Sequence, residues 1–454
     1  MTTSTASANS PRVDWSLIWA QRGFRYFFFA MFVSLFGSGM NFAGVSWYIL
    51  AATHSTVKVS LQVIVVTLPG LFVPFLGGVL IDRFDRRYLG VLLDLVRGFF
   101  VLGTAYIAWR GNLQIWHLYA MTLITGIGSA MYWATVNALV QEVIPPSQFT
   151  GANAAVLVGV QSGMLIAGSL VGFIYNTAGI AGILAIDGAT YFVSAYCLYQ
   201  VRRGYVSPRS HKYAREYSEA TEATAEALET GENPEVAEAG LSLAVYSDMK
   251  EGFAYLKEQP LVRALGITHS IMMAGVVSAN VVLVALVNDV LHSGPKGLGF
   301  LEAGWAIGAI SGGLVASQLR QKWRMPLYVV SCAGLAIGHM ATPFVAFVVG
   351  AALIQVLFGF FRALGGVVAQ SSLMGIVPRH FMGRTQSAMA ILTTIFQLFM
   401  SFALGAIAEG AGLVAAYTLL AILYLLSTVF ATRARQLSNR ALAAESSSLS
   451  PSTR

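Results

Sequence analysis

The chain has little charge and almost no cysteine. Only 11% of its 454 residues are charged, whereas a soluble globular domain carries about 25%. Side chains of this composition cannot cover a folded surface in water, which excludes an ordinary soluble domain. The two cysteines, Cys197 and Cys332, both lie inside apolar runs, so we expect neither a disulfide framework nor a metal site.

Long apolar runs dominate the sequence. The hydrophobic content is 56% and the mean hydropathy is +0.66. A helix needs roughly 20 apolar residues to cross about 30 Å of hydrocarbon. Twelve runs reach that length: 26–51, 57–81, 88–109, 116–142, 152–176, 179–201, 261–288, 298–319, 326–345, 347–377, 384–408 and 412–432. The pattern predicts an all-α membrane protein with twelve transmembrane helices.

The basic residues predict the orientation. With both termini in the cytoplasm, 23 of the 28 Lys and Arg lie in inner loops and tails. Three lie in outer loops (Lys58, Arg110 and Lys296) and two within spans (Arg97 and Arg362). Positive charge in short loops stays cytoplasmic. The net charge of +7 therefore reflects topology and not a nucleic-acid surface, and we expect a multi-pass protein of the inner (cytoplasmic) membrane.

Composition divides the chain into five segments. They are a cytoplasmic tail at 1–20, a six-helix half at 21–202, a cytoplasmic linker at 203–257, a second six-helix half at 258–433 and a disordered cytoplasmic tail at 434–454. In the linker, eight glutamates between Glu216 and Glu238 recur every three or four residues, which predicts a solvated helix or disorder. From Leu241 an amphipathic pattern predicts a helix at the membrane surface.

The loop after the second apolar run reads Gly78-Val-Leu-Ile-Asp-Arg-Phe-Asp-Arg-Arg87. It resembles the loop between spans two and three of the major facilitator superfamily, G-x-L-x-D-R-x-G-R-[RK], with Asp85 in place of the second glycine. The resemblance implies a gate in which Asp82 points at the start of span eleven and Arg86 bridges to Glu142. The implied gate residues are Gly78, Asp82, Arg83, Arg86, Arg87, Glu142 and Gly383.

Two sequence segments each recur later in the chain at nearly the same spacing, which indicates an internal duplication. The segment 143–153 aligns with 376–386 with a one-residue gap, at an offset of about 233, and the loop at 78–87 has a weaker echo at 312–324. Parallel six-helix repeats build transporters of the facilitator type. The resemblance thus implies two pseudo-symmetric six-helix halves that work by alternating access.

The entry to the seventh span resembles one branch of this superfamily. Its segment 248–263 contains Glu251-Gly252, Tyr255-Leu256 and Pro260, which is similar to the branch of drug exporters and the enterobactin exporter. The similarity covers roughly 20–433. It implies export of an amphipathic small molecule, drug-like or siderophore-like.

Charged residues inside spans are functional candidates, because burying them in lipid is costly. Asp187, in the sixth span, is a candidate proton carrier or a carboxylate held by neighbouring helices. Asp94 and Arg97 are three residues apart and share a helix face, which favours a structural ion pair over a pair coupled to protonation. Arg362 contacts substrate, pairs with a carboxylate such as Asp94 or Glu142, or snorkels to the membrane surface. If it is unpaired in the cavity, it favours neutral or anionic cargo over quaternary ammonium dyes.

In the fold implied by the resemblance, spans one, four, seven and ten line a central cavity. Polar, aromatic and methionine side chains on these spans suit large amphipathic ligands, although any of them could instead pack between helices. The candidates for the substrate cavity are Asn41, Trp47, Tyr48, Tyr132, Trp133, Asn137, His269, Met272, Asn280, Gln355 and Arg362.

We therefore expect a monomeric secondary active exporter without a cofactor, with the proton as coupling ion and a small molecule and the lipid bilayer as partners, and no nucleic acid. An importer or lipid-type translocator on the same fold is the alternative. From another class, a membrane sensor could bind a partner through the acidic linker. The sequence contains no Ser/His/Asp set, metal-ligand cluster or phosphate loop, so no enzymatic activity is expected.

Overall fold

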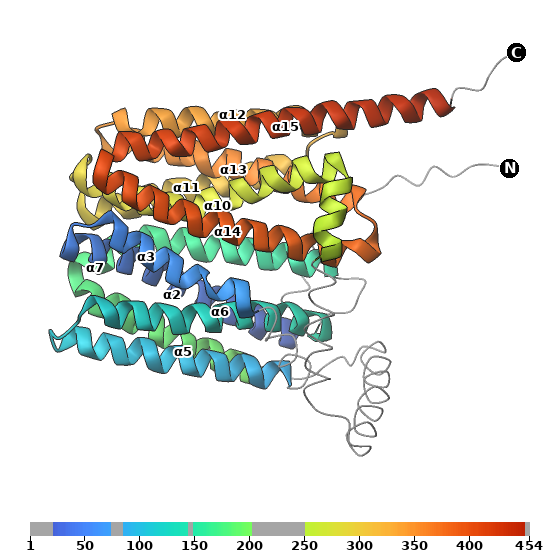
Figure 1. The fold of residues 1–454 in the computed structure, drawn as a ribbon. Coiled ribbons are helices and arrows are strands. Elements are labelled where there is room, and N and C mark those ends of the chain that lie inside the picture. Colours follow the sequence, from blue (N-terminus) through green and yellow to red (C-terminus); the bar gives the residue numbers. More distant parts are fainter. Residues whose placement is uncertain (1–20, 74–84, 144–148, 202–249, 450–454) are drawn as a thin grey trace, which may run out of the picture.

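The computed structural model describes residues 21–73, 85–143, 149–201 and 250–449, with some side chains inside these ranges left out. Within these ranges the helices lie side by side in two groups (Figure 1). The first group contains α2 (Arg22–Thr53), α3 (Thr56–Thr67), α5 (Arg86–Trp109), α6 (Ile115–Val143) and α7 (Phe149–Gln200). The second contains α10 (Pro260–Asp289), α11 (Gly294–Ser317), α12 (Gln321–Ala341), η2 (Thr342–Phe344), α13 (Val348–Ile376), α14 (Arg379–Ala411) and α15 (Leu413–Leu449).

The described helices account for the twelve predicted spans. Ten stretches of described residues are long and apolar enough to cross a membrane. The 52-residue α7 bends at Gly179, whose φ of 62° suits glycine because it has no Cβ. This bend falls at the predicted boundary between spans five and six. Two further spans bring the number to twelve: one is the part of α7 before Gly179, and the other is the 29-residue α6.

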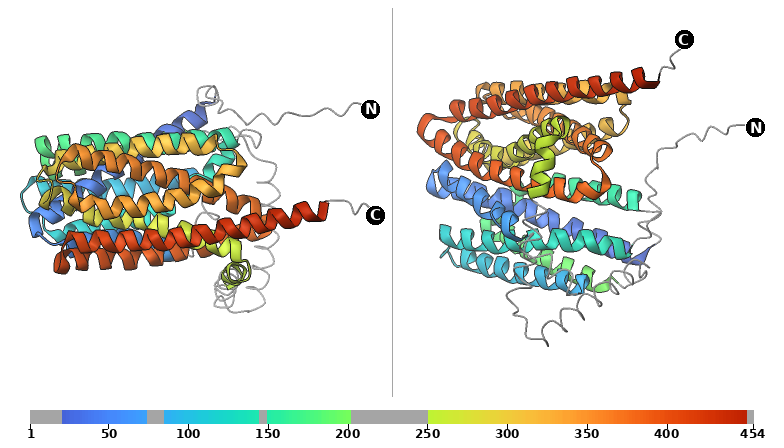
Figure 2. Two further views of the ribbon diagram at one scale, coloured as in Figure 1. Left: turned by 90° about the horizontal axis from the view of Figure 1, so that it is seen from above. Right: turned by 45° about the vertical axis from the view of Figure 1, so that its right-hand side comes forward.

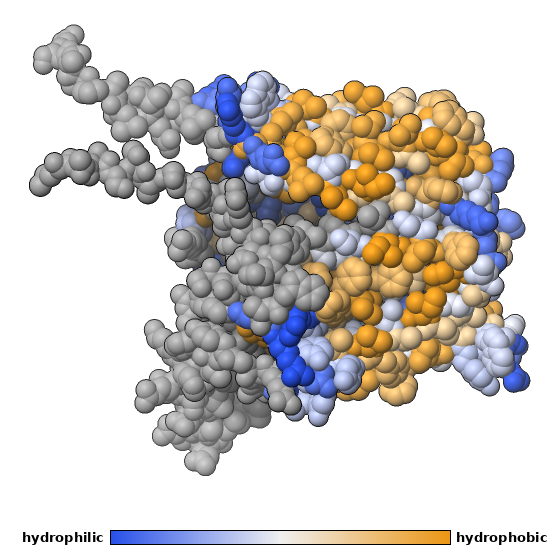
Figure 3. Space-filling view, turned by 180° about the vertical axis from the view of Figure 1, so that it is seen from behind, coloured by the Kyte–Doolittle hydropathy of each residue, from blue (hydrophilic) through white to orange (hydrophobic). Residues whose placement is uncertain are grey.

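The outer surface of the bundle is built to face lipid. Figure 3 shows apolar side chains as a broad band across the middle of one face, with hydrophilic side chains toward the ends. Exposed aromatic residues lie near helix ends: Trp109 ends α5 and Trp116 lies at the start of α6, whereas Tyr88 lies near the start of α5 and Trp323 near the start of α12. Aromatic side chains of this kind favour the boundary between hydrocarbon and water. The chain is a multi-pass membrane protein.

Glycines let α11 lie directly on the backbone of α13. A Cβ added to Gly308 would lie 1.9 Å from the carbonyl oxygen of Val356, and Gly304 and Gly312 face the α13 backbone in the same way one turn to either side. Small residues at such positions let helices in lipid gain van der Waals contact at short range. The spacing of the three glycines fixes the register of α11 on α13.

The two groups of helices meet along two seams. In one, the first part of α7 packs on α11, where a Cβ on Gly168 would lie 2.6 Å from the Cβ of Glu302. In the other, α3 packs on α14, and the Thr56 hydroxyl donates to the carbonyl oxygen of Gly405 over 2.8 Å. The space between these seams is where the two halves enclose a cavity.

A short helix, 250–258, crosses one end of the bundle and lies against the start of α14 (Figure 2). The Tyr255 and Phe381 rings stack with centroids 4.9 Å apart, and Glu251 forms an ion pair with Arg384. This helix is the described end of the predicted amphipathic segment. The glutamate-rich part of the linker lies outside the described residues.

The prediction of a disordered tail from 434 is wrong for most of its length. Helix α15 continues without a break to Leu449. The physical reason is local: residues 434–449 contain no glycine or proline and include four alanines and three leucines, which favour a helix. Pro451 follows soon after the helix ends.

Candidate functional site

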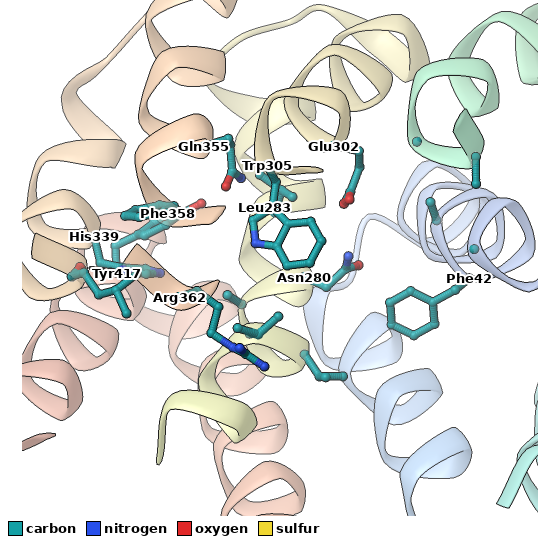
Figure 4. Close-up of a pocket in the computed structure, with 18 of the residues that line it drawn as sticks. Phe42, Asn280, Leu283, Glu302, Trp305, His339, Gln355, Phe358, Arg362 and Tyr417 are labelled. Atoms are coloured by element: carbon teal, nitrogen blue, oxygen red, sulfur yellow. Dashed lines mark hydrogen bonds between the residues drawn. The ribbon is translucent and has the colours of Figure 1, made fainter. Parts of the chain in front are cut away.

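A cavity of about 210 Å³ lies between the two halves of the bundle. Its walls come from α2 and α7 on one side and from α10, α11, α12, α13 and α15 on the other. Figure 4 shows Phe42 of α2 facing Asn280, Trp305 and Arg362 across this space. The lining is mostly apolar with a few polar groups, as is usual for small-molecule sites.

Two side chains of opposite formal charge face the cavity. Arg362, on α13, contacts the sulfur of Met273, and its Nε is buried without a hydrogen-bond partner in the described part of the chain. Glu302, on α11, also lines the cavity. Among the described residues neither side chain is in an ion pair. An ionisable residue without a partner between membrane helices is costly to bury and is a functional-site candidate by default, so both side chains are candidates for ligand contact.

One end of the cavity has an aromatic wall. The His339 ring stacks between Phe358 and Tyr424, at centroid distances of 4.1 and 4.8 Å. Its Nδ1 lies 2.7 Å from the carbonyl oxygen of Leu335, which fixes the orientation of the ring. Such a stack holds one shape and offers a ligand ring faces on which it can pack.

Three of the predicted cavity residues line this space, namely Asn280, Gln355 and Arg362. The remaining described candidates lie elsewhere. Asn41 and Tyr132 belong to a buried polar network in the first half, Met272 contacts the sulfur of Cys332, and His269 is buried near Arg362 without lining the cavity. Trp47 is buried and Tyr48 half-buried in the core of the first half, and the side chain of Asn137 is not described.

The cavity is displaced toward the second half relative to the prediction. Helix α6, which the resemblance implied as a wall, contributes no described side chain to the lining. Its Tyr132 turns into the first half, and Trp133 is 46% exposed. Helices α11 and α12 supply Glu302, Trp305 and His339 in its place.

A salt bridge between Asp94 and Arg97 lies at the centre of the first half, as their spacing predicts. Both side chains are buried, at 0% and 2% exposure. Ser194 donates to the other oxygen of Asp94 over 2.6 Å. The Arg97 guanidinium lies between the rings of Tyr132 and Tyr191, 4.5 and 4.4 Å from their centroids. Carboxylate and aromatic faces together compensate a cation that water cannot reach.

Asp187 lies in the same buried region, on the second part of α7. Its Oδ2 accepts a hydrogen bond from Asn41 over 2.5 Å, while Oδ1 is buried without a partner among the described residues. A Cβ on Gly37 would lie 2.6 Å from that oxygen. Ser38, one residue on, hydrogen-bonds Tyr191 at 2.9 Å. Helix α2 thus supplies both the space and two of the polar partners of this network.

A second face of helix α2, next to the one that contacts the buried network, lines the cavity. Gly39, Phe42 and Ala43 line the cavity, whereas Ser38 and Asn41 contact the buried network. Residues three or four apart share a face of a helix, so these two sets form adjacent stripes on α2. A rotation or tilt of α2 would therefore alter the cavity and the buried carboxylates together.

The predicted gate falls largely outside what the structure describes. Gly78, Asp82 and Arg83 lie in the undescribed stretch 74–84, and the side chain of Glu142 is not described either, nor are the surroundings of Gly383. At the described end of the loop, Asp85 caps α5 by accepting from the Arg87 backbone N–H over 3.0 Å. Arg87 also donates to the carbonyl oxygen of Val201 over 3.2 Å, and Arg86 begins α5.

Glu302 and Trp305 are site residues that the sequence-based candidates omit. The signal for Glu302 was present, because it is an acid inside a predicted apolar run. Trp305 has no comparable signal. A tryptophan in a membrane helix can face lipid, a neighbouring helix or a cavity, and the surrounding sequence looks the same in all three cases.

The family model described as Major Facilitator Superfamily matches residues 27–354. The chain belongs to the major facilitator superfamily. Two relatives match this chain over different lengths. The uncharacterized MFS-type transporter YkuC of Bacillus subtilis is 24% identical over 186 residues, 41% of this chain and 43% of YkuC. The enterobactin exporter EntS of Salmonella typhi is 25% identical over 376 residues, 81% of each chain.

Solved transporter structures share the fold of this chain. A mutant of the nucleoside transporter NupG superposes with a TM-score of 0.67 at 12% identity, covering 91% of this chain and 99% of NupG. At that identity the likeness concerns the fold alone. The cavity between the two facilitator halves is accordingly the candidate path for a small-molecule substrate.

Proposed function

We propose that this transporter exports an amphipathic small molecule, drug-like or siderophore-like, across the cytoplasmic membrane in exchange for protons. One observation carries the proposal. Helix α2 presents Phe42 to the cavity and Asn41 to the buried carboxylate of Asp187. Substrate binding and proton binding would then act on the same helix from adjacent faces, which is the arrangement that coupled transport needs.

The charges of the network set Asp187 apart from Asp94. Two carboxylates and one guanidinium lie together, and Arg97 is in direct contact with Asp94. The second carboxylate therefore has no cation of its own. Its Oδ1 is buried without a partner among the described residues, which supports Asp187 as the proton-binding group of this proposal.

The cavity chemistry supports an amphipathic cargo. Aromatic faces from Phe42, Trp305 and Phe358 provide apolar contact, and Arg362 provides a site for an anionic or electron-rich group. The cavity of about 210 Å³ is smaller than the roughly 300–1,000 Å³ of most ligand pockets, so a drug-sized cargo requires the halves to move apart. Outward direction is supported by relatives such as EntS, whose name describes an exporter.

A substitution at Asp187 tests the proposal. Asp187→Asn keeps the shape and the contact with Asn41 but cannot bind and release a proton. In proteoliposomes we expect it to abolish substrate movement driven by a pH gradient while leaving substrate exchange at equal pH within about twofold. Asp289→Asn, which changes an exposed carboxylate at the end of α10, is the matched control. Normal pH-driven transport in Asp187→Asn would move the coupling site elsewhere.

A further inference from the structure

We propose that Glu302, Trp305 and Phe42 form a binding subsite for an organic ammonium group of the transported molecule. The inference rests on the proposed transport function and names a feature of the cargo that the sequence did not predict. It begins with Glu302, a carboxylate that lines the cavity. Figure 4 shows it pointing into the cavity beside the indole of Trp305, with Phe42 on the opposite wall.

No polar contact in the described ranges gives Glu302 a structural role. Within the described ranges it forms no ion pair with a basic side chain and accepts no hydrogen bond from the helices beside it. Its neighbour across the seam is Gly168, whose missing side chain makes room for the glutamate stem. A carboxylate used to hold helices together would have a donor from a neighbouring helix, as Asp94 has from Ser194.

The surroundings of Glu302 suit an ammonium group. Glu302 and Trp305 are three residues apart on α11 and so share one face of that helix, and both line the cavity. An indole is the best aromatic partner for a cation, and a carboxylate adds a full opposite charge. Phe42, from the other half, can close the site from the opposite side. Acid and aromatic rings together select an organic ammonium over a neutral group of the same shape.

The register of the helices separates this subsite from Arg362. Because Gly304, Gly308 and Gly312 face Ala352, Val356 and Phe360, each residue of α11 is level with the one 48 positions later in α13. Glu302 is then level with Gly350, and Arg362 lies twelve residues deeper, roughly 18 Å at 1.5 Å per residue. The cavity thus has an acidic end and a basic end.

This separation defines the class of cargo. A small ion can satisfy one end, whereas an elongated amphiphile can place an amine at Glu302 and an anionic or electron-rich group toward Arg362. The inference refines the expectation drawn from Arg362 alone, which favoured neutral or anionic cargo over quaternary ammonium dyes. An amine is favoured at the acidic end and disfavoured at the basic end.

A matched pair of probes tests the subsite. Dansylcadaverine carries a terminal ammonium group, and its N-acetyl derivative is neutral and otherwise nearly the same. Binding of each to the full chain in neutral-lipid nanodiscs is measured by energy transfer from tryptophan, with empty nanodiscs as background. We expect the wild type to bind the amine about tenfold more tightly than the acetylated probe, and Glu302→Gln to remove that preference.

Three further variants sharpen the result. Trp305→Leu should weaken binding of the amine by about 3- to 10-fold and the acetylated probe less. Glu302→Asp, which keeps the charge but withdraws it by one methylene, should retain part of the preference and serves if Glu302→Gln does not fold. Asp289→Asn, at an exposed carboxylate outside the cavity, should keep all of it.

Three outcomes would overturn the subsite. The first is an unchanged amine preference in Glu302→Gln, and the second is no amine preference in the wild type. The third is an equal loss of both probes in Glu302→Gln together with loss of pH-driven transport, which would make Glu302 a proton site. Failure of the proposed transport function is distinguishable, because binding in nanodiscs does not depend on export or on a proton gradient.

Discussion

Ser55 donates a hydrogen bond to the carboxylate of Glu409 over 2.6 Å and so joins the start of α3 to the end of α14 across the boundary between the two halves. The same carboxylate accepts from the backbone N–H of Val57 over 3.1 Å. An anion at the N-terminus of a helix is stabilised by the unpaired amides and the helix dipole. This contact lies at the end of the bundle predicted to face outward and links the two halves there.

Glu409→Gln should loosen this outer contact. The neutral amide keeps the shape but loses the charge, which is worth about 0.3–1 kcal/mol at a helix N-terminus, or a population shift of roughly two- to fivefold. Spin labels at Lys58 and Gly410 should therefore report a larger share of long distances. Asp289→Asn, which lies outside this seam, should leave the distribution unchanged. An identical distribution in Glu409→Gln would mean that other contacts close the outer end.

Gly308→Ala should destabilise the second half. Its methyl group would meet the carbonyl oxygen of Val356 at 1.9 Å, and because that atom belongs to the backbone, the helices themselves must separate. Overpacking of this kind costs about 1–3 kcal/mol. Gly313→Ala on the same helix is the matched control, since an added Cβ there meets nothing within 4 Å. We expect a lower thermal midpoint for the first variant and an unchanged one for the second.

The buried charges of the first half should behave as a unit. Asp94→Asn leaves Arg97 without its contacting carboxylate and should cost about 3–5 kcal/mol, as breaking buried ion pairs does. Asp187→Asn should cost far less, because the Asp94–Arg97 pair stays intact. The double variant should lose more than the sum of the two, since Arg97 then has no acid nearby. Thermal midpoints that simply add would show that Asp187 does not sense Arg97.

The short helix 250–258 should depend on its aromatic contact more than on its ion pair. Glu251 and Arg384 are 47% and 37% exposed, and exposed pairs contribute only about 0–1 kcal/mol. The stack of Tyr255 on Phe381 buries apolar area as well. Tyr255→Ala should therefore raise amide hydrogen exchange over 250–258 markedly, and Glu251→Gln should raise it little. The reverse order would show that charge holds this helix in place.

The spans could be predicted because a bilayer leaves so few alternatives. Backbone groups in hydrocarbon must be satisfied within a helix, so length and hydropathy were enough, and the break near Gly179 followed from the two adjacent runs. The pair of Asp94 and Arg97 followed from helical spacing alone. These features depend on local sequence.

The lining of the cavity could not be predicted in the same way. In a membrane helix the side facing lipid and the side facing a neighbour are both apolar, so no stripe in the sequence shows which residues point inward. Trp133 and Trp305 look alike in sequence, yet one is 46% exposed on α6 and the other faces the cavity. Their positions follow from how α6 and α11 are rotated, which long-range packing determines.

Arg362→Ala should weaken anionic ligands selectively. The guanidinium faces the cavity without an acidic partner among the described residues, so it can give a charge-assisted hydrogen bond to a ligand. Dansylglycine, which carries a carboxylate, should lose about tenfold or more in affinity, whereas the neutral N-acetyl derivative of dansylcadaverine should change by less than about threefold. Arg362→Lys should lie between, because lysine keeps the charge but lacks the planar fork. Equal binding of dansylglycine to the wild type and to Arg362→Ala would remove this residue from the substrate site, and the basic end of the cavity would then serve packing alone.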